Sequence, residues 1–160
     1  MFTVGERVVH PIHGAGVIAE ITEERMEGTL KRYYVFSAPL NGLTLKIPVS
    51  SSGVVGLRYP ITHQQLSELF ASLRETEDNS AENWNHRYRE NLDRIKSGDV
   101  HKVAQVVKGL LCREARRGLS TVERKMLRSA KQILLSEVML VENLTYDGAE
   151  QLLSRSLLAE

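Results

Sequence analysis

The sequence is poor in cysteine, in aromatic residues and in long apolar runs. Its single cysteine, Cys112, excludes a disulfide within the chain. No apolar run approaches the ~18 residues that a membrane-spanning helix needs. The N-terminal residues 1–10 also lack the basic and then apolar pattern of a signal peptide. We therefore expect a cytoplasmic protein that has no association with membranes.

Motifs that carry catalytic or cofactor chemistry are also missing. The segment Gly14-Ala15-Gly16 lacks the third glycine and the strand-to-helix setting of a dinucleotide site. His10 and His13 flank a Pro-Ile pair, but too few further ligands lie near them for a metal site. Cys112 has no recognisable general base beside it, and no Ser-His-Asp set stands out. We expect a protein that is not an enzyme and that uses no metal, cofactor or small-molecule substrate.

Charge is distributed unevenly along a chain of otherwise globular composition. Hydrophobic residues make up 42% and charged residues 26%, and the formal net charge is only +1. Residues 81–132, however, contain 13 basic and 6 acidic side chains, which gives this segment a net charge of +7. Such a segment indicates a polyanionic partner, and the alternative is a helix surface that is merely well solvated.

The chain changes its hydrophobic period near Tyr59-Pro60. Before this point apolar residues alternate with polar ones, as in the segments 17–22 and 43–47, and 31–37 is rich in aromatic and branched residues. Asn41-Gly42 is typical of a hairpin turn between two such runs. Residues 1–60 are therefore predicted to form five or so short strands in a small antiparallel barrel of the SH3 or Tudor type.

After Pro60 the spacing of apolar residues becomes helical. Helix starts and stops divide residues 61–160 into five predicted helices, with a polar break at 75–80. Capping boxes at Thr62 with Gln65 and at Ser120 with Glu123 mark two helix starts, and further starts are expected near Ser80 and at Asp99. Gly98 and Gly118 are expected to end helices, and a last helix is predicted over 145–158. The predicted fold class is α+β, with an antiparallel Tudor/SH3-like barrel in 1–60 and an all-α bundle of about five helices in 61–160.

The fourth predicted helix carries a basic stripe. Arg124, Arg128 and Lys131 recur at i, i+4 and i+7, away from the apolar face. Such a stripe suits the phosphates of a nucleic acid without reading its bases. The glycine turn at Gly118 between two helices is also compatible with a helix-turn-helix motif, although no Asn or Gln suited to adenine lies near Thr121.

The only tryptophan, Trp84, lies in a second basic cluster, at residues 84–89. It stands four residues before Tyr88 and eight before Leu92, and this spacing favours a place in the core. Its neighbours Arg87 and Arg89 instead favour a nucleic-acid contact, in which a ring stacks on or separates bases.

The order and spacing of many short segments resemble the CarD / CdnL family of bacterial transcription regulators. The resemblance extends over nearly the whole chain and rests on Val4-Gly5, Val8-Val9-His10-Pro11, His13-Gly14, LTLKIP at 43–48, Asn83-Trp84, Arg87-Tyr88, Asn91-Leu92, Ser97-Gly98-Asp99, Lys102-Val103-Ala104, Val106-Val107, Arg117-Gly118-Leu119-Ser120, Glu123, Met126-Leu127, Ala130 and Gln132-Ile133-Leu134. It implies a Tudor-like N-terminal domain, similar to that of transcription-repair coupling factors, which binds the RNA polymerase β subunit partly by strand addition.

The resemblance also implies that the helical domain meets promoter DNA near the minus-ten element. The tryptophan that wedges into the minor groove in this family matches Trp84. The residues expected at DNA are Trp84, Arg87, Arg89, Arg124, Lys125 and Arg128.

On the polymerase side Lys46 matches a basic contact of the family, and Pro48 follows it on a strand predicted to lie at an edge. A second basic contact of the family aligns with Glu24. Either a shift in the loop lets Arg25 serve instead, or this protein makes that contact differently or more weakly. We expect a monomer that stabilises the promoter open complex. The alternatives are a stand-alone helix-turn-helix repressor and a polymerase adaptor without DNA contact.

Overall fold

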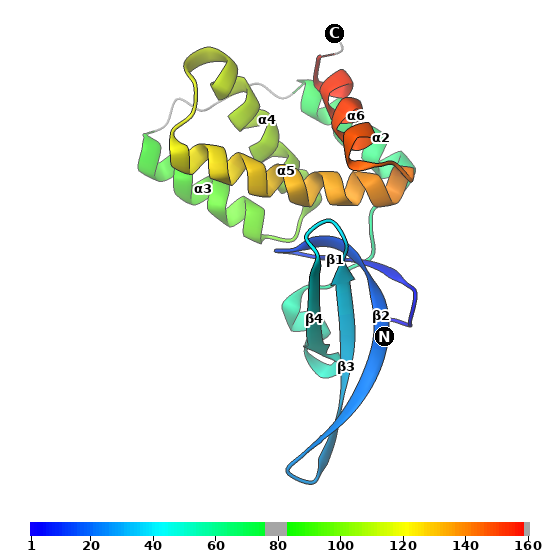
Figure 1. Cartoon of the computed structure of the whole chain (residues 1–160). Coiled ribbons are helices and arrows are strands. Elements are labelled where there is room, and N and C mark those ends of the chain that lie inside the picture. The colour runs from blue at the N-terminus through cyan, green and yellow to red at the C-terminus, as the bar shows by residue number, and fades with distance from the viewer. Residues whose placement is uncertain (76–82, 159–160) are drawn as a thin grey trace. The chain divides into compact units, whose positions relative to one another are not determined.

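The structure, a computed structural model, describes residues 1–75 and 83–158. The chain divides into two compact units, Met1–Pro60 and Ile61–Glu160, at the position where the hydrophobic period changes (Figure 1). The predicted helix start near Ser80 lies outside the described residues. None of the helices described is both long enough and apolar enough to cross a membrane.

The N-terminal unit is a curled antiparallel sheet of four strands in the order β1-β2-β3-β4 (Figure 1). The strands are β1 (Arg7–His10), β2 (Gly14–Met26), β3 (Thr29–Ala38) and β4 (Leu43–Pro48), and the 3₁₀ turn η1 (Val49–Ser51) and the short helix α1 (Ser52–Val55) follow them. This confirms the predicted Tudor-like class, with one strand fewer than the five or so expected. The predicted turn at Asn41-Gly42 joins β3 to β4.

Alternation along the strands builds the core of this unit. Tyr34, Phe36 and Ile47 are buried together with Val8 and Ile18 on one face of the sheet. Gly16 is required here, because a Cβ at this position would lie 2.3 Å from the Ser37 carbonyl oxygen.

The two edges of the sheet differ. Beside β1, the backbone N–H of Val9 donates to the Arg58 carbonyl at 2.7 Å, and the Arg58 N–H donates back at 3.1 Å. The segment after α1 therefore covers the edge at β1. β4 pairs only with β3 among the described residues, so it is the edge that remains open.

The C-terminal unit contains five described helices, as predicted. They are α2 (His63–Glu75), α3 (Trp84–Lys96), α4 (Val100–Arg117), α5 (Thr121–Glu142) and α6 (Tyr146–Leu158). The predicted caps are confirmed: Gln65 N–H donates to Thr62 Oγ1 at 3.1 Å, and Glu123 N–H donates to Ser120 Oγ at 3.2 Å. Gly98 and Gly118 have the positive φ angles of helix-ending residues.

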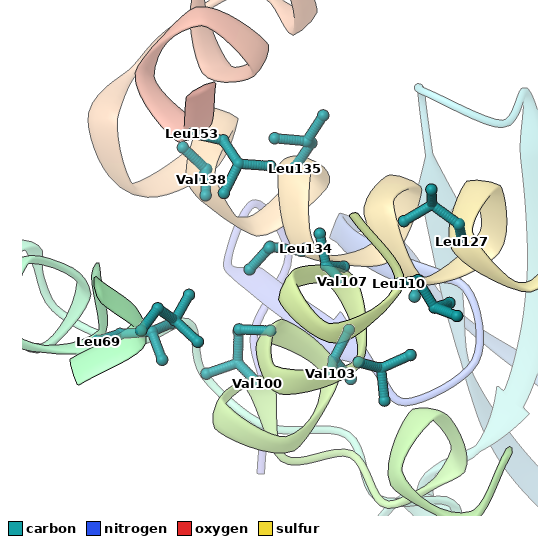
Figure 2. Close-up of a cluster of buried hydrophobic side chains, with 14 of the residues drawn as sticks. Leu69, Val100, Val103, Val107, Leu110, Leu127, Leu134, Leu135, Val138 and Leu153 are labelled. Atoms are coloured by element: carbon teal, nitrogen blue, oxygen red, sulfur yellow. The ribbon is translucent and has the colours of Figure 1, made fainter. Parts of the chain in front are cut away.

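Apolar side chains from all of these helices meet in one core, part of which is drawn in Figure 2. Leu69 comes from α2, Val103 and Leu110 from α4, and Leu134 from α5, and each is almost fully buried. Leu153 of α6 belongs to the same cluster. The last helix is therefore an integral part of the bundle, and it covers α2 and α5.

Candidate nucleic-acid and protein interfaces

Trp84 is the first residue of α3 and lies at the surface of the helical unit. The side chain of Asn83 caps the helix by accepting a hydrogen bond from His86 N–H at 2.9 Å. Trp84 is 41% exposed, and its indole stacks on the ring of Tyr88 with the centroids 5.2 Å apart and the planes 9° from parallel. Tyr88 and Leu92 pack against the core as their spacing predicts, but Trp84 lies beyond it.

An open hollow adjoins the indole. It is lined by Asn83, Trp84, Asn85, His86 and Arg89. Two amides and a guanidinium offer hydrogen-bond donors around the aromatic ring, a combination suited to phosphate oxygens and to acceptors on base edges.

Arg87 does not belong to this surface. It is only 8% exposed, and its Nε donates to Oε2 of Glu123 on α5 at 3.1 Å. The prediction that Arg87 contacts DNA is therefore corrected to a structural contact inside the unit. Arg87 shares the inner face of α3 with Asn91 and Ile95, which are spaced at i+4 and i+8 and are also buried.

Exposed cations occupy the first turns of α5. Arg124, Lys125 and Arg128 are exposed, and among the described residues none of them has an acidic partner. The predicted stripe is shorter than expected, because Lys131 is half-buried and pairs with Glu150 of α6.

The ion pair between Arg87 and Glu123 joins the beginnings of α3 and α5, which lie on the same side of the unit (Figure 1). We use the name α3–α5 surface for Trp84, Arg89, Arg124, Lys125 and Arg128. It combines an exposed aromatic ring with cations, so it is the candidate nucleic-acid interface.

The candidate protein interface is the open edge of the sheet. Lys46 lies on β4 with 55% of its side chain exposed, and it forms an ion pair with Glu24 of β2 across the intervening strand. The hydrogen bond to Glu24 raises the pKa of Lys46. Pro48 ends the same strand, in register with Tyr33. A proline is tolerated here because β4 is an edge strand.

The strand register separates Arg25 from this site. Glu24 is opposite Lys31, and Arg25 is opposite Leu30. Because adjacent residues of a strand point to opposite faces, Arg25 lies on the face away from Glu24 and Lys46. Arg25 is exposed on the opposite face from Lys46, and its contact with polymerase stays a prediction. Lys31, which sequence reasoning overlooked, is an exposed cation that shares the face of Lys46.

Comparison with known proteins covers both units. Residues 2–59 match the family described as the CarD-like/TRCF RID domain, and residues 68–154 match the CarD C-terminal domain. The chain belongs to the CarD family of transcription regulators. A CarD-like relative from Bacillus subtilis (strain 168), YdeB, is named as a candidate transcription factor and is 32% identical over 146 residues. That alignment covers 91% of this chain and 95% of the relative.

Membership of the CarD family confirms the resemblance inferred from the sequence. The N-terminal unit is of the class shared with transcription-repair coupling factor, whose members interact with RNA polymerase. This CarD-like protein is thus a transcription regulator that has RNA polymerase as its partner, and this is not an enzyme class.

Proposed function

We propose that this CarD-like protein docks on the β subunit of RNA polymerase and stabilises the promoter open complex. In this proposal the N-terminal unit supplies the attachment, and the α3–α5 surface meets DNA at the upstream edge of the melted region near the minus-ten element. Attachment to polymerase raises the effective concentration of the second contact. The DNA contact can therefore be weak and independent of sequence.

The observation that carries the proposal is the exposed indole of Trp84. One face of the ring rests on Tyr88, which packs against the helical core and supports the ring from behind. A supported and partly exposed ring is suited to insertion at a distorted base step, where it replaces lost stacking. A factor shifts an equilibrium only through its differential affinity for the two states. A ring that fits only opened DNA provides such a difference.

The cations of the α3–α5 surface support the same proposal. Arg89, Arg124 and Arg128 are exposed and carry charge that no acidic side chain of the described chain neutralises. Such side chains bind phosphates and release counterions, which adds affinity without base recognition.

The open edge at β4 supports the docking half. An exposed edge strand can accept a strand from a partner through main-chain hydrogen bonds, and side chains at the edge then provide specificity. Lys46 and Pro48 lie on this strand, and Lys31 lies on the same face of the sheet.

The test is the lifetime of the open complex formed by polymerase with wild-type protein, Lys46→Glu or Trp84→Ala. We expect Trp84→Ala to shorten the lifetime about tenfold, equivalent to ~1.4 kcal/mol. Lys46→Glu should also shorten it, but a higher protein concentration should restore the wild-type lifetime because only docking is weakened. Leu144→Ala, which truncates an apolar side chain between α5 and α6, is the matched control and should have no effect.

The two alternatives give different results in the same assays. A stand-alone repressor would bind one DNA sequence tightly in a gel shift without polymerase. A polymerase adaptor would bind polymerase normally and show the same open-complex lifetime with Trp84→Ala as with the wild type. Either outcome would refute the proposal.

A further inference from the structure

A buried ionic junction connects three helices next to the α3–α5 surface. Arg87 of α3 donates to Oε2 of Glu123 at 3.1 Å, and Nε of Arg113 on α4 lies 3.8 Å from the same oxygen. The other carboxylate oxygen accepts from Ser120 Oγ at 3.3 Å. Glu123 is 4% exposed, so one buried carboxylate is shared by the three helices.

This junction is a poor device for stability alone. Burying a charge removes its hydration, and the attraction between buried partners often does no more than offset that loss. Apolar side chains of similar size would hold the helices together equally well. The arginine–carboxylate contact differs because it is directional, so it fixes the rotation and register of the helices that carry it.

The position of Arg87 makes α3 depend on this contact. Trp84, Asn85 and His86 are exposed, and Arg87 is the first buried residue of the helix. The turn that carries the indole is therefore attached to the unit by an ion pair, with the half-buried Tyr88 beside it. On α5, Arg124 follows Glu123 directly, so the same pair lies between the indole and the exposed cations.

We infer that Arg87 and Glu123 are positioning residues, whose ion pair sets the orientation of Trp84 relative to the cations of α5. This inference rests on the proposed function, because the orientation matters only if the ring and the cations engage one DNA segment together. If the ring and the cations are already oriented in the free protein, binding costs less conformational entropy. The preset orientation then favours opened DNA, because that is the form of DNA that it fits.

The only tryptophan of the chain gives a direct readout of this orientation. We would measure acrylamide quenching and anisotropy decay of Trp84 in the free protein, together with open-complex lifetime. Arg87→Met keeps the aliphatic stem and removes the charge, and Arg87→Lys keeps the charge without the planar guanidinium. Arg94→Met is the matched control, since Arg94 lies on the same helix and its guanidinium forms an exposed ion pair, 3.7 Å from Glu90.

For Arg87→Met we expect roughly twofold stronger quenching of Trp84, faster local motion, and a roughly fivefold smaller gain in open-complex lifetime. Arg87→Lys should recover part of each change, and Arg94→Met should match the wild type. Thermal unfolding of each variant separates positioning from stability. If Arg87→Met fails to fold, the double variant Arg87→Met/Glu123→Gln replaces it, because both charges of the buried pair are then removed and glutamine preserves the capping box.

Wild-type quenching and anisotropy in Arg87→Met would overturn the inference, and so would a lower melting temperature with an unchanged lifetime. Failure of the proposed function is seen separately, as an unchanged lifetime for Trp84→Ala. The fluorescence measurements need no polymerase, so in that case they still decide whether the junction orients the indole.

Discussion

The two units place their charged groups in different ways. In the sheet, Lys46 is exposed but paired with Glu24, and the buried titratable group is a neutral histidine, His10. In the helical unit Arg87 and Glu123 form a buried ion pair, while the cations at the start of α5 have no acidic partner among the described residues. A surface that presents balanced charge suits a protein partner, and a surface with unpaired cations suits a polyanion.

The largest effect should come from breaking the buried pair. Glu123→Gln removes the carboxylate that Arg87 and Arg113 share, and breaking a buried ion pair from one side costs about 3 kcal/mol or more of unfolding free energy. Urea denaturation followed by Trp84 fluorescence reports on the helical unit alone. Glu90→Gln, which removes an exposed partner of Arg94, should change stability by less than about 0.5 kcal/mol. Equal effects of the two variants would remove the distinction between buried and exposed pairs.

The second largest expected effect is a loss of stability at low pH, caused by His10 in the sheet. Burial first, and the nearby charge of His13 second, lower the pKa of His10 from 6.5 to about 4. Its Nδ1 accepts hydrogen bonds from the N–H groups of Ile12 and His13, at 3.1 and 3.2 Å. The neutral ring thus holds the turn between β1 and β2.

Because the folded pKa is lowered, His10 favours the folded state above pH 6.5, and this contribution is lost as the pH falls toward about 4. Linkage gives a loss of about 2 kcal/mol by pH 5 in the N-terminal unit. Hydrogen exchange of amides in β1 and β2, followed from pH 7 to pH 5, measures this loss. His10→Gln should flatten the dependence, and a flat wild-type profile would contradict the assignment.

The third effect concerns the unpaired cations. Arg124→Gln and Arg128→Gln should each reduce the slope of log affinity against log salt by about 0.9, if each arginine neutralises one phosphate. Binding of the protein to duplex DNA, measured by fluorescence anisotropy over a range of salt concentrations, gives this slope. Arg155→Gln on α6 is the control, since it removes an exposed arginine that does not belong to the α3–α5 surface. An unchanged slope in all three variants would exclude this part of α5 from the DNA contact.

Local rules were sufficient for most of the fold. The capping boxes at Ser120 and Thr62, the glycine stops and the buried leucines of the helices all follow from spacing, and each is confirmed. The sequence did not settle the place of Trp84. Trp84, Tyr88 and Leu92 do follow a helical spacing, and Tyr88 and Leu92 pack against the core. Trp84, however, lies at the first turn of the helix, where the core does not cover its side chain.

The positions of Arg87 and Arg25 depend on contacts between distant parts of the chain. A pattern of charges cannot distinguish an arginine at the surface from one buried on a carboxylate 36 residues later, as Arg87 is on Glu123. The face on which Arg25 and Lys31 lie depends on strand register, because a shift of one residue would exchange the two faces. The ion pair of Lys46 requires the pairing of β2, β3 and β4 together.

The smallest effect should come from the exposed pair of the sheet. Glu24 holds the ammonium of Lys46 within the protein, so an acidic group of a partner must displace it. Exposed pairs contribute little to stability because solvent screens them, so Glu24→Gln should leave stability nearly unchanged and tighten polymerase binding by at most about fivefold. The double variant Glu24→Lys/Lys46→Glu restores the pair with its direction reversed. If Lys46 itself contacts polymerase, this variant should keep wild-type stability yet bind polymerase as weakly as Lys46→Glu. If the double variant instead recovers polymerase binding, the pair matters only for the shape of the sheet. The difference in charge between the two units would then no longer explain why one binds a protein and the other a polyanion.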